Sequence, residues 1–131
     1  CISSKATLEK YQITFIYDIA EYLKTLDAVE QMDADMFVPA HADASESIIK
    51  LVQFNRKKVY EIADKICEIL KTPTSSEILL KKVFDEYKLT MNFEQYVLVG
   101  STVRSYLSWL KDNGRVSVEF RDNQLFLCFF Y

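Results

Sequence analysis

The sequence predicts a mostly helical α+β fold. Half of the 131 residues are apolar, which is enough to form a hydrophobic core. Apolar residues recur at helical spacing over most of the chain. Two runs near the C-terminus, residues 115–120 and 125–131, have the length and composition of strands. No apolar run approaches the roughly 18 residues that a membrane-spanning helix needs, and we see no signal peptide, so we expect a cytoplasmic protein.

Net charge and cysteine content exclude some classes of protein. The net charge of −3 provides no general attraction to nucleic acid. Cys1, Cys67 and Cys128 are widely spaced and odd in number, which favours reduced thiols over a disulfide framework. The chain begins at Cys1 without an initiator methionine, so we interpret it as a piece of a longer protein.

The first elements are two short apolar runs with a helix between them. Residues 13–17 (ITFIY) have the length of a buried strand or strand end. Apolar spacing predicts a helix over residues 18–33, with Asp18 as its N-cap and Glu21 completing a capping box. Residues 36–40 (MFVPA) form the second run, and the proline in it would end a strand or place it at a sheet edge.

A long helix is expected next, beginning near Asp43 or Ser45 and ending at about Lys71. Its apolar stripe is interrupted by one polar residue, Asn55. We expect Asn55 to be buried and hydrogen-bonded, with backbone groups of the loops beside His41 as its partners. The stripe consists of Ile48, Val52, Asn55, Val59, Ile62, Ile66 and Ile69.

Pro73 marks the predicted domain boundary, which divides the chain into residues 1–72 and 73–131. Thr74 and Glu77 predict a capping box for the following helix. Three helices and a hairpin should follow, which is the order of a winged helix-turn-helix. They are expected at residues 78–87, 93–99 and 103–110, with a turn at 100–102, a C-cap at Asn113-Gly114, and strands at 115–120 and 125–131 around the turn RDNQ.

Such a module could read DNA through basic side chains on its last helix and hairpin. The candidates are Arg104, Lys111, Arg115 and Arg121. Asp112, Glu119 and Asp122 lie in the same region and bring the local charge close to neutral. Phosphate contacts supply most nucleic-acid affinity, so we expect a packing role for this module and regard DNA binding as the alternative. Residues 125–131 (LFLCFFY) also favour a packing role. Both faces of that strand are apolar, so we expect other parts of the protein to bury them.

His41 is the only histidine in the chain. A zinc site needs three or four ligands, and no Cys-x-x-Cys or His-x-His motif accompanies it. Taken locally, His41 is a hydrogen-bonded loop or core residue, and nothing places a cysteine beside it as a nucleophile. Asp43 is interpreted as a helix cap.

The order of these elements resembles the C-terminal part of a metallo-β-lactamase-fold hydrolase, in the branch that ends in a winged-helix extension. Residues 17–42 (YDIAEYLKTLDAVEQMDADMFVPAHA) are similar to the penultimate helix and the last catalytic strand, which ends in proline, a small residue and histidine, followed by glycine or alanine. Residues 48–70 match the long helix that follows, with Asn55 at its recurrent asparagine. Residues 100–120 are similar to the small C-terminal module.

This resemblance implies the C-terminal piece of an αββα fold followed by a winged helix. It implies that His41 is a metal ligand, to the second of two zinc or similar divalent ions, and that Asn55 supports the site. The intact protein would be a hydrolase in which metal-activated water attacks an ester, thioester, lactone or phosphodiester. The family's His-x-His-x-Asp-His motif and its bridging aspartate are absent from this sequence.

The piece by itself is therefore expected to be metal-free or weakly metal-binding, and catalytically inactive. The intact protein is expected to act on a small-molecule or phosphodiester substrate. The expected partners of the piece are the missing N-terminal half of the fold and a second copy bound through exposed apolar surfaces, with no membrane. The competing hypothesis is a non-enzymatic winged-helix module that binds DNA or protein.

Overall fold

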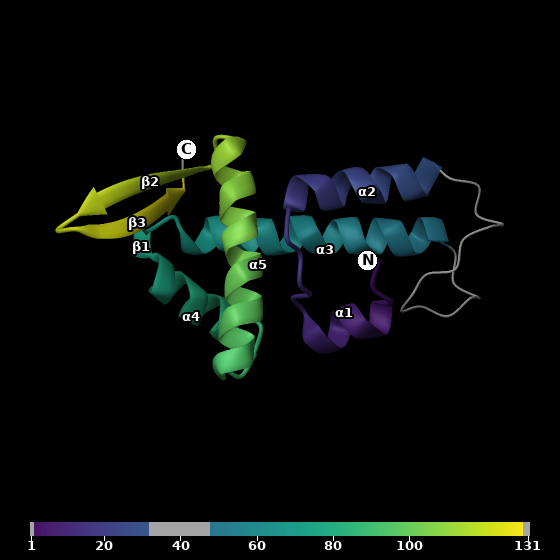
Figure 1. Cartoon of the computed structure of the whole chain (residues 1–131), viewed down its shortest axis with the longest axis horizontal. Coiled ribbons are helices and arrows are strands. Elements are labelled where there is room, and N and C mark those ends of the chain that lie inside the picture. The colour runs from purple at the N-terminus through teal and green to yellow at the C-terminus, as the bar shows by residue number, and fades with distance from the viewer. Residues whose placement is uncertain (1, 32–47, 130–131) are drawn as a thin grey trace.

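The computed structural model describes residues 2–31 and 48–129 and confirms a mostly helical α+β arrangement with a small sheet (Figure 1). The elements, in chain order, are α1 (Lys5–Tyr11), α2 (Ile19–Gln31), α3 (Ile48–Ile69), β1 (Thr74–Ser75), α4 (Ser76–Glu86), α5 (Phe93–Asp112), β2 (Val116–Arg121) and β3 (Gln124–Phe129).

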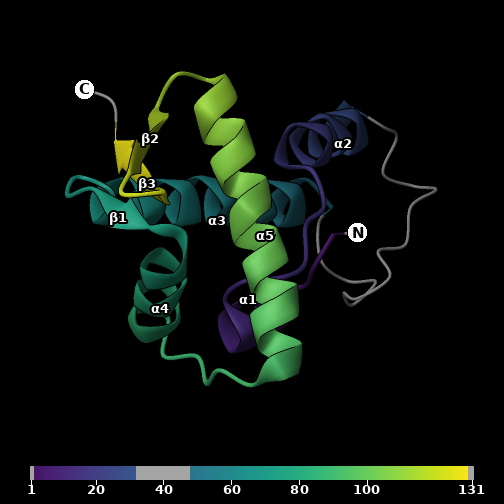
Figure 2. The same ribbon diagram turned by 60° about the vertical axis from the view of Figure 1, so that its left-hand side comes forward.

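The long helix α3 is the axis of the molecule. α2 runs antiparallel beside its first half, and α1 lies along the other side of that half (Figures 1 and 2). α5 crosses the second half of α3. α4 and the sheet lie at the far end of α3 from α1. The predicted stripe on α3 is confirmed, because all of its residues are buried except Ile69, which is partly buried.

Residues 13–17 do not form the expected strand. Ile13 and Ile16 are buried as predicted, but this segment links α1 to α2 as irregular backbone. The Ile16 N–H donates to the Thr102 hydroxyl at 3.2 Å instead of to a neighbouring strand. A strand requires a partner for its backbone groups, and here a side chain of α5 takes that place.

The caps of the first helices are partly as expected. The Asp18 carboxylate accepts a hydrogen bond from the Glu21 N–H at 3.0 Å, which confirms the N-cap of α2. The Glu21 carboxylate does not complete a capping box, because it pairs with Lys24 at 3.2 Å. The cap that was expected at Asp43 or Ser45 lies outside the described residues.

The N-cap of α4 is Ser75, not Thr74. Thr74 pairs with Leu127 in the sheet, and this extended position moves the cap one residue along the chain. The Ile78 N–H then approaches the Ser75 hydroxyl at 3.4 Å. The Glu77 carboxylate accepts a hydrogen bond from the Tyr96 hydroxyl at 2.9 Å instead of closing a capping box.

One continuous helix, α5, replaces the two helices and the turn that were expected over residues 93–112. Gly100 lies inside this helix and is buried against α4, where a Cβ on it would lie 3.5 Å from Leu80 Cδ2. The Thr102 hydroxyl bonds to the Leu98 carbonyl of the preceding turn at 3.1 Å, so it does not cap a new helix. Gly100 therefore lies in the interior of a helix, and the space around it would accept a Cβ at ordinary contact distance.

The predicted end of α5 is confirmed. Gly114 has a φ of +73°, which glycine adopts without steric cost. Its N–H bonds to the Lys111 carbonyl, and the Arg115 N–H reaches back to the Leu110 carbonyl at 2.9 Å. These two bonds form a Schellman motif, which satisfies carbonyls at the end of the helix.

The hairpin is also confirmed, and β1 adds a third strand to it. Asp122 and Asn123 both have positive φ, as a two-residue type I′ turn requires, and Arg121 pairs with Gln124 across it. The strand order is β1-β3-β2, with both pairs antiparallel. Leu127 is buried in the core, whereas Phe120 near the tip is 75% exposed.

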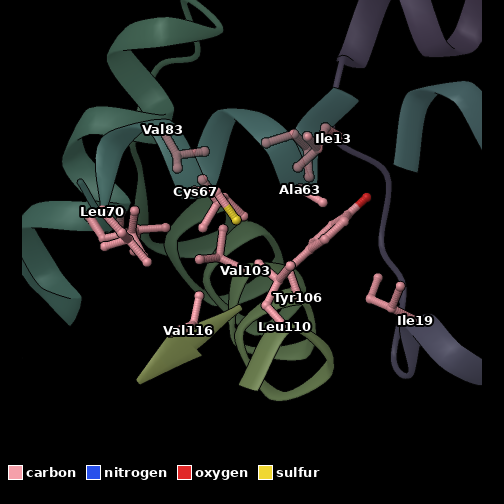
Figure 3. Close-up of a cluster of buried hydrophobic side chains, with 14 of the residues drawn as sticks. Ile13, Ile19, Ala63, Cys67, Leu70, Val83, Val103, Tyr106, Leu110 and Val116 are labelled. Atoms are coloured by element: carbon pink, nitrogen blue, oxygen red, sulfur yellow. The ribbon is translucent and has the colours of Figure 1, made fainter. Parts of the chain in front are cut away.

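The described residues form two core clusters. The smaller one joins α2 to the first half of α3 and contains Ile2, Leu26, Val29, Ile48, Leu51 and Val52. The larger one joins the second half of α3 to α4, α5 and the sheet, and Figure 3 shows side chains from these elements converging in it. It contains residues from both sides of Pro73. Among the helices of residues 2–31 and 48–129, none is both long and apolar enough to cross a membrane.

Candidate functional site around Asn55

Asn55 lies on α3 where the two core clusters meet. Val52, one turn earlier, belongs to the smaller cluster, and Val59, one turn later, belongs to the larger one. The side chain is almost completely buried, with 1% of its surface exposed. A polar group at such a position needs hydrogen-bond partners, because burial without them is costly.

All four hydrogen-bonding positions of the Asn55 amide are used. Its Oδ1 accepts from the Ser3 N–H at 3.1 Å and from the Tyr22 hydroxyl at 2.9 Å. Its Nδ2 donates to the carbonyls of Ser3 and Leu51, both at 2.8 Å. An amide group has two donors and two acceptor lone pairs, so this set is complete. We call Asn55, Ser3 and Tyr22 the Asn55 network.

These partners differ from the ones expected beside His41. The sequence correctly indicated that Asn55 is buried and hydrogen-bonded, but Ser3 is 52 residues away and no spacing rule connects the two. Tyr22 could have been suspected, because it follows Ile19 by three residues and therefore lies near the apolar face of α2.

Tyr22 packs against both core clusters. Burial raises the pKa of its hydroxyl to about 12, so Tyr22 keeps its proton at neutral pH and donates it to Asn55. The network therefore ties α2, α3 and the segment around Ser3 together through neutral groups.

His41 lies outside the described residues, as do Cys1, Asp43, Ser45 and the apolar run 36–40. Within residues 2–31 and 48–129, no group of three or more histidine, cysteine, aspartate or glutamate side chains could hold a metal ion. Cys67 is buried, which raises the pKa of its thiol, and both Cys67 and Cys128 are free thiols.

The four basic residues considered for DNA binding do not form one positive surface. Arg115 pairs with Asp64 at 3.1 Å, and Arg121 pairs with Glu119 at 2.6 Å. Lys111 lies in the last turn of α5. Arg104 lines an open pocket of about 410 Å³ between the start of α2 and α5, where two carboxylates, those of Asp18 and Asp112, are also present. Carboxylates thus pair with or accompany three of the four cations.

No protein-family model matches this sequence, and no curated protein matches it. A solved structure with a similar fold is the crystal structure of a "Beta-lactamase domain protein" from Burkholderia ambifaria. The TM-score is 0.73 at 16% sequence identity, and the match covers 86% of this chain but 33% of the other. This likeness establishes a shared fold, over about one third of that structure's length.

Proposed function

We propose that this chain is the C-terminal part of a metal-dependent hydrolase of the metallo-β-lactamase superfamily. The observation that carries the proposal is the fold shared with a β-lactamase domain protein over most of this chain. Two features of the sequence support it. Pro39-Ala40-His41-Ala42 stands in the connection between α2 and α3, and Asn55 stands one third of the way along α3.

His41 would supply one ligand to the second of two divalent ions, most simply zinc. A two-metal site needs several further ligands, and the described residues provide no such group. In this proposal those ligands lie in the N-terminal half of the fold, as the family resemblance implies, and we expect this chain alone to be inactive. When bound, such ions supply an activated water for attack on an ester, thioester, lactone or phosphodiester.

Asn55 would support that site indirectly, by holding the backbone of Ser3. Its amide holds the backbone of Ser3 at both the N–H and the carbonyl, against α3 and Tyr22. In the metallo-β-lactamase family, the bridging aspartate comes just before a stretch that residues 1–11 (CISSKATLEKY) resemble. Asn55 would thus hold the chain close to that aspartate and fix its direction, as groups that support metal ligands do.

The C-terminal elements support a winged helix as the second module. The end of α3, then β1, α4, α5, β2 and β3 follow in the order helix, strand, helix, helix and hairpin, with the strands arranged β1-β3-β2. In this proposal α5 takes the place of the recognition helix and the hairpin is the wing. The carboxylates near Arg104, Arg115 and Arg121 favour packing or dimerisation over DNA binding.

The test is the metal content of the intact protein, measured by elemental analysis. We expect two metal equivalents per chain in the unmodified protein and one in His41→Ala, together with loss of most hydrolytic activity. Cys128→Ser is a matched control, because it removes another potential metal ligand from the described residues and should leave both ions in place. Unchanged metal content in His41→Ala would refute the ligand assignment.

The DNA-binding alternative has its own readout. A winged-helix reader would bind duplex DNA with an affinity that falls steeply as salt rises, and charge reversal at Arg104 and Arg115 would abolish binding. We expect no such salt-dependent binding by this chain.

A further inference from the structure

The hydroxyl of Tyr106 is a buried polar group with no hydrogen-bond partner in residues 2–31 and 48–129. Tyr106 lies on α5 and is 1% exposed. Within the described part of the chain, its hydroxyl oxygen makes no hydrogen bond. Figure 3 shows the ring extending from α5 past Ala63, with the hydroxyl pointing toward the segment that carries Ile13. Burial raises the pKa of this hydroxyl well above its ordinary value, so it keeps a proton to donate.

Tyr106 lines a small cavity of about 10 Å³ where α1, α2, α3 and α5 meet. That volume corresponds to about one water molecule and is too small for an organic ligand. Lys58 also lines the cavity, and its ammonium group disfavours a cation there. The cavity is not purely apolar, since Tyr22, Asn55 and Thr14 contribute polar side chains to its wall.

Two of these polar groups have hydrogen-bonding capacity left. The Tyr22 hydroxyl donates its proton to Asn55 and still has lone pairs to accept a bond. The Thr14 hydroxyl can also accept a hydrogen bond. Asn55 has no capacity left, because all four of its positions are filled. The ammonium of Lys58 is already bonded to Gln12 at 2.6 Å and paired with Glu61 at 3.1 Å.

We propose that this cavity binds one ordered water molecule, which joins the hydroxyl of Tyr106 to that of Tyr22 and so connects α5 to the Asn55 network. The water accepts a bond from Tyr106 and donates to Tyr22 and Thr14. Three hydrogen bonds are typical of a buried water. A continuous polar chain then runs from α5 through Tyr22 and Asn55 to the backbone of Ser3, across the junction of the two core clusters.

A high-resolution crystal structure of this chain tests the proposal directly. We expect an ordered water at roughly 2.6–3.1 Å from both the Tyr106 and the Tyr22 oxygen atoms. An empty cavity, or a direct hydrogen bond from Tyr106 to a protein atom, would overturn it.

Urea unfolding of hydroxyl deletions provides a second test, because the sign of the effect differs between the two cases. A hydroxyl bonded to water contributes to stability, so Tyr106→Phe should raise the equilibrium constant for unfolding roughly three- to tenfold. A buried hydroxyl without a hydrogen-bond partner destabilises the folded state. If Tyr106→Phe lowers the equilibrium constant for unfolding, the proposal is contradicted.

The double variant distinguishes a shared water from two separate effects. Combining Tyr106→Phe with Tyr22→Phe should raise the constant by less than the product of the two single effects, because both hydroxyls bind one water. If the double variant raises the constant by the full product of the two single effects, the result would count against a shared water. Tyr60→Phe is the matched control, since Tyr60 is 45% exposed and lies away from the cavity lining, and it should change the constant by less than roughly threefold.

Discussion

At the scale of single residues, Asn55 shows how one polar side chain can organise an apolar junction. It lies on the buried face of α3, where an apolar residue would fill the same space with no need for partners. Its four hydrogen bonds instead fix the position of Ser3 and Tyr22 relative to α3. The sequence indicated its burial through the interrupted stripe. Its partners depended on the tertiary structure, because an amide can bond to any group brought within reach.

We expect Asn55→Ala to lower the free energy of unfolding by about 2–4 kcal/mol. The substitution leaves the buried Ser3 N–H and carbonyl and the Tyr22 hydroxyl without their partners. Urea denaturation followed by circular dichroism measures the effect. Gln53→Ala, an exposed change two residues earlier on the same helix, is the control and should shift the free energy by less than about 0.5 kcal/mol. A loss below about 1 kcal/mol for Asn55→Ala would contradict a central role for the network.

At the scale of elements, α5 shows how packing decides between a turn and a helix. Gly100, Ser101 and Thr102 are a reasonable turn and N-cap by local rules. In the structure the helix continues through them, since Leu80 of α4 packs against Gly100 and the Thr102 hydroxyl supports the segment before α2. The predictions at Asp18 and Gly114 were right because a cap involves groups only a few residues apart.

Gly100→Ala tests the continuous helix. Alanine has a higher helix propensity than glycine, and its Cβ would meet Leu80 at 3.5 Å, an ordinary contact distance. We therefore expect this substitution to raise the free energy of unfolding by roughly 0.5–1 kcal/mol, measured by thermal and urea denaturation.

Gly114→Ala provides the contrast. Gly114 has a φ of +73°, a conformation that is strained for alanine, so the free energy of unfolding of the Gly114→Ala variant should fall by about 1 kcal/mol.

For Gly100→Ala, a lower free energy of unfolding would contradict the continuous helix and favour a break at that residue.

At the scale of the whole molecule, the larger core cluster joins residues that the predicted boundary at Pro73 separates. Leu70 and Ile66 precede the proline, whereas Leu79, Val83 and Val103 follow it, and all five belong to one cluster. The Phe129 N–H also bonds to the Leu70 carbonyl at 2.8 Å, which attaches β3 to the end of α3. We expect the parts of the chain before and after Pro73 to unfold together.

Amide hydrogen exchange after Leu79→Ala tests this cooperativity. Removing a fully buried leucine should lower the free energy of unfolding by about 2–5 kcal/mol. If the chain unfolds as one unit, the slowest amides of α2 and α5 should both exchange faster, by the same factor. Faster exchange confined to α4, α5 and the sheet would indicate two independent domains with a boundary at Pro73. Ile78→Ala, at a neighbouring half-exposed position, is the control and should have little effect on either helix.

Local sequence was sufficient to predict the helical content, the cap at Asp18, the glycine end of α5, the hairpin turn and the burial of Asn55. Each of these depends on hydrogen bonds or periodicity within a few residues, which local composition encodes. Three features followed from tertiary packing: residues 13–17 are not a strand, residues 93–112 form one helix, and Asn55 bonds to Ser3. These outcomes depend on partners far along the chain, which become neighbours only when the core packs.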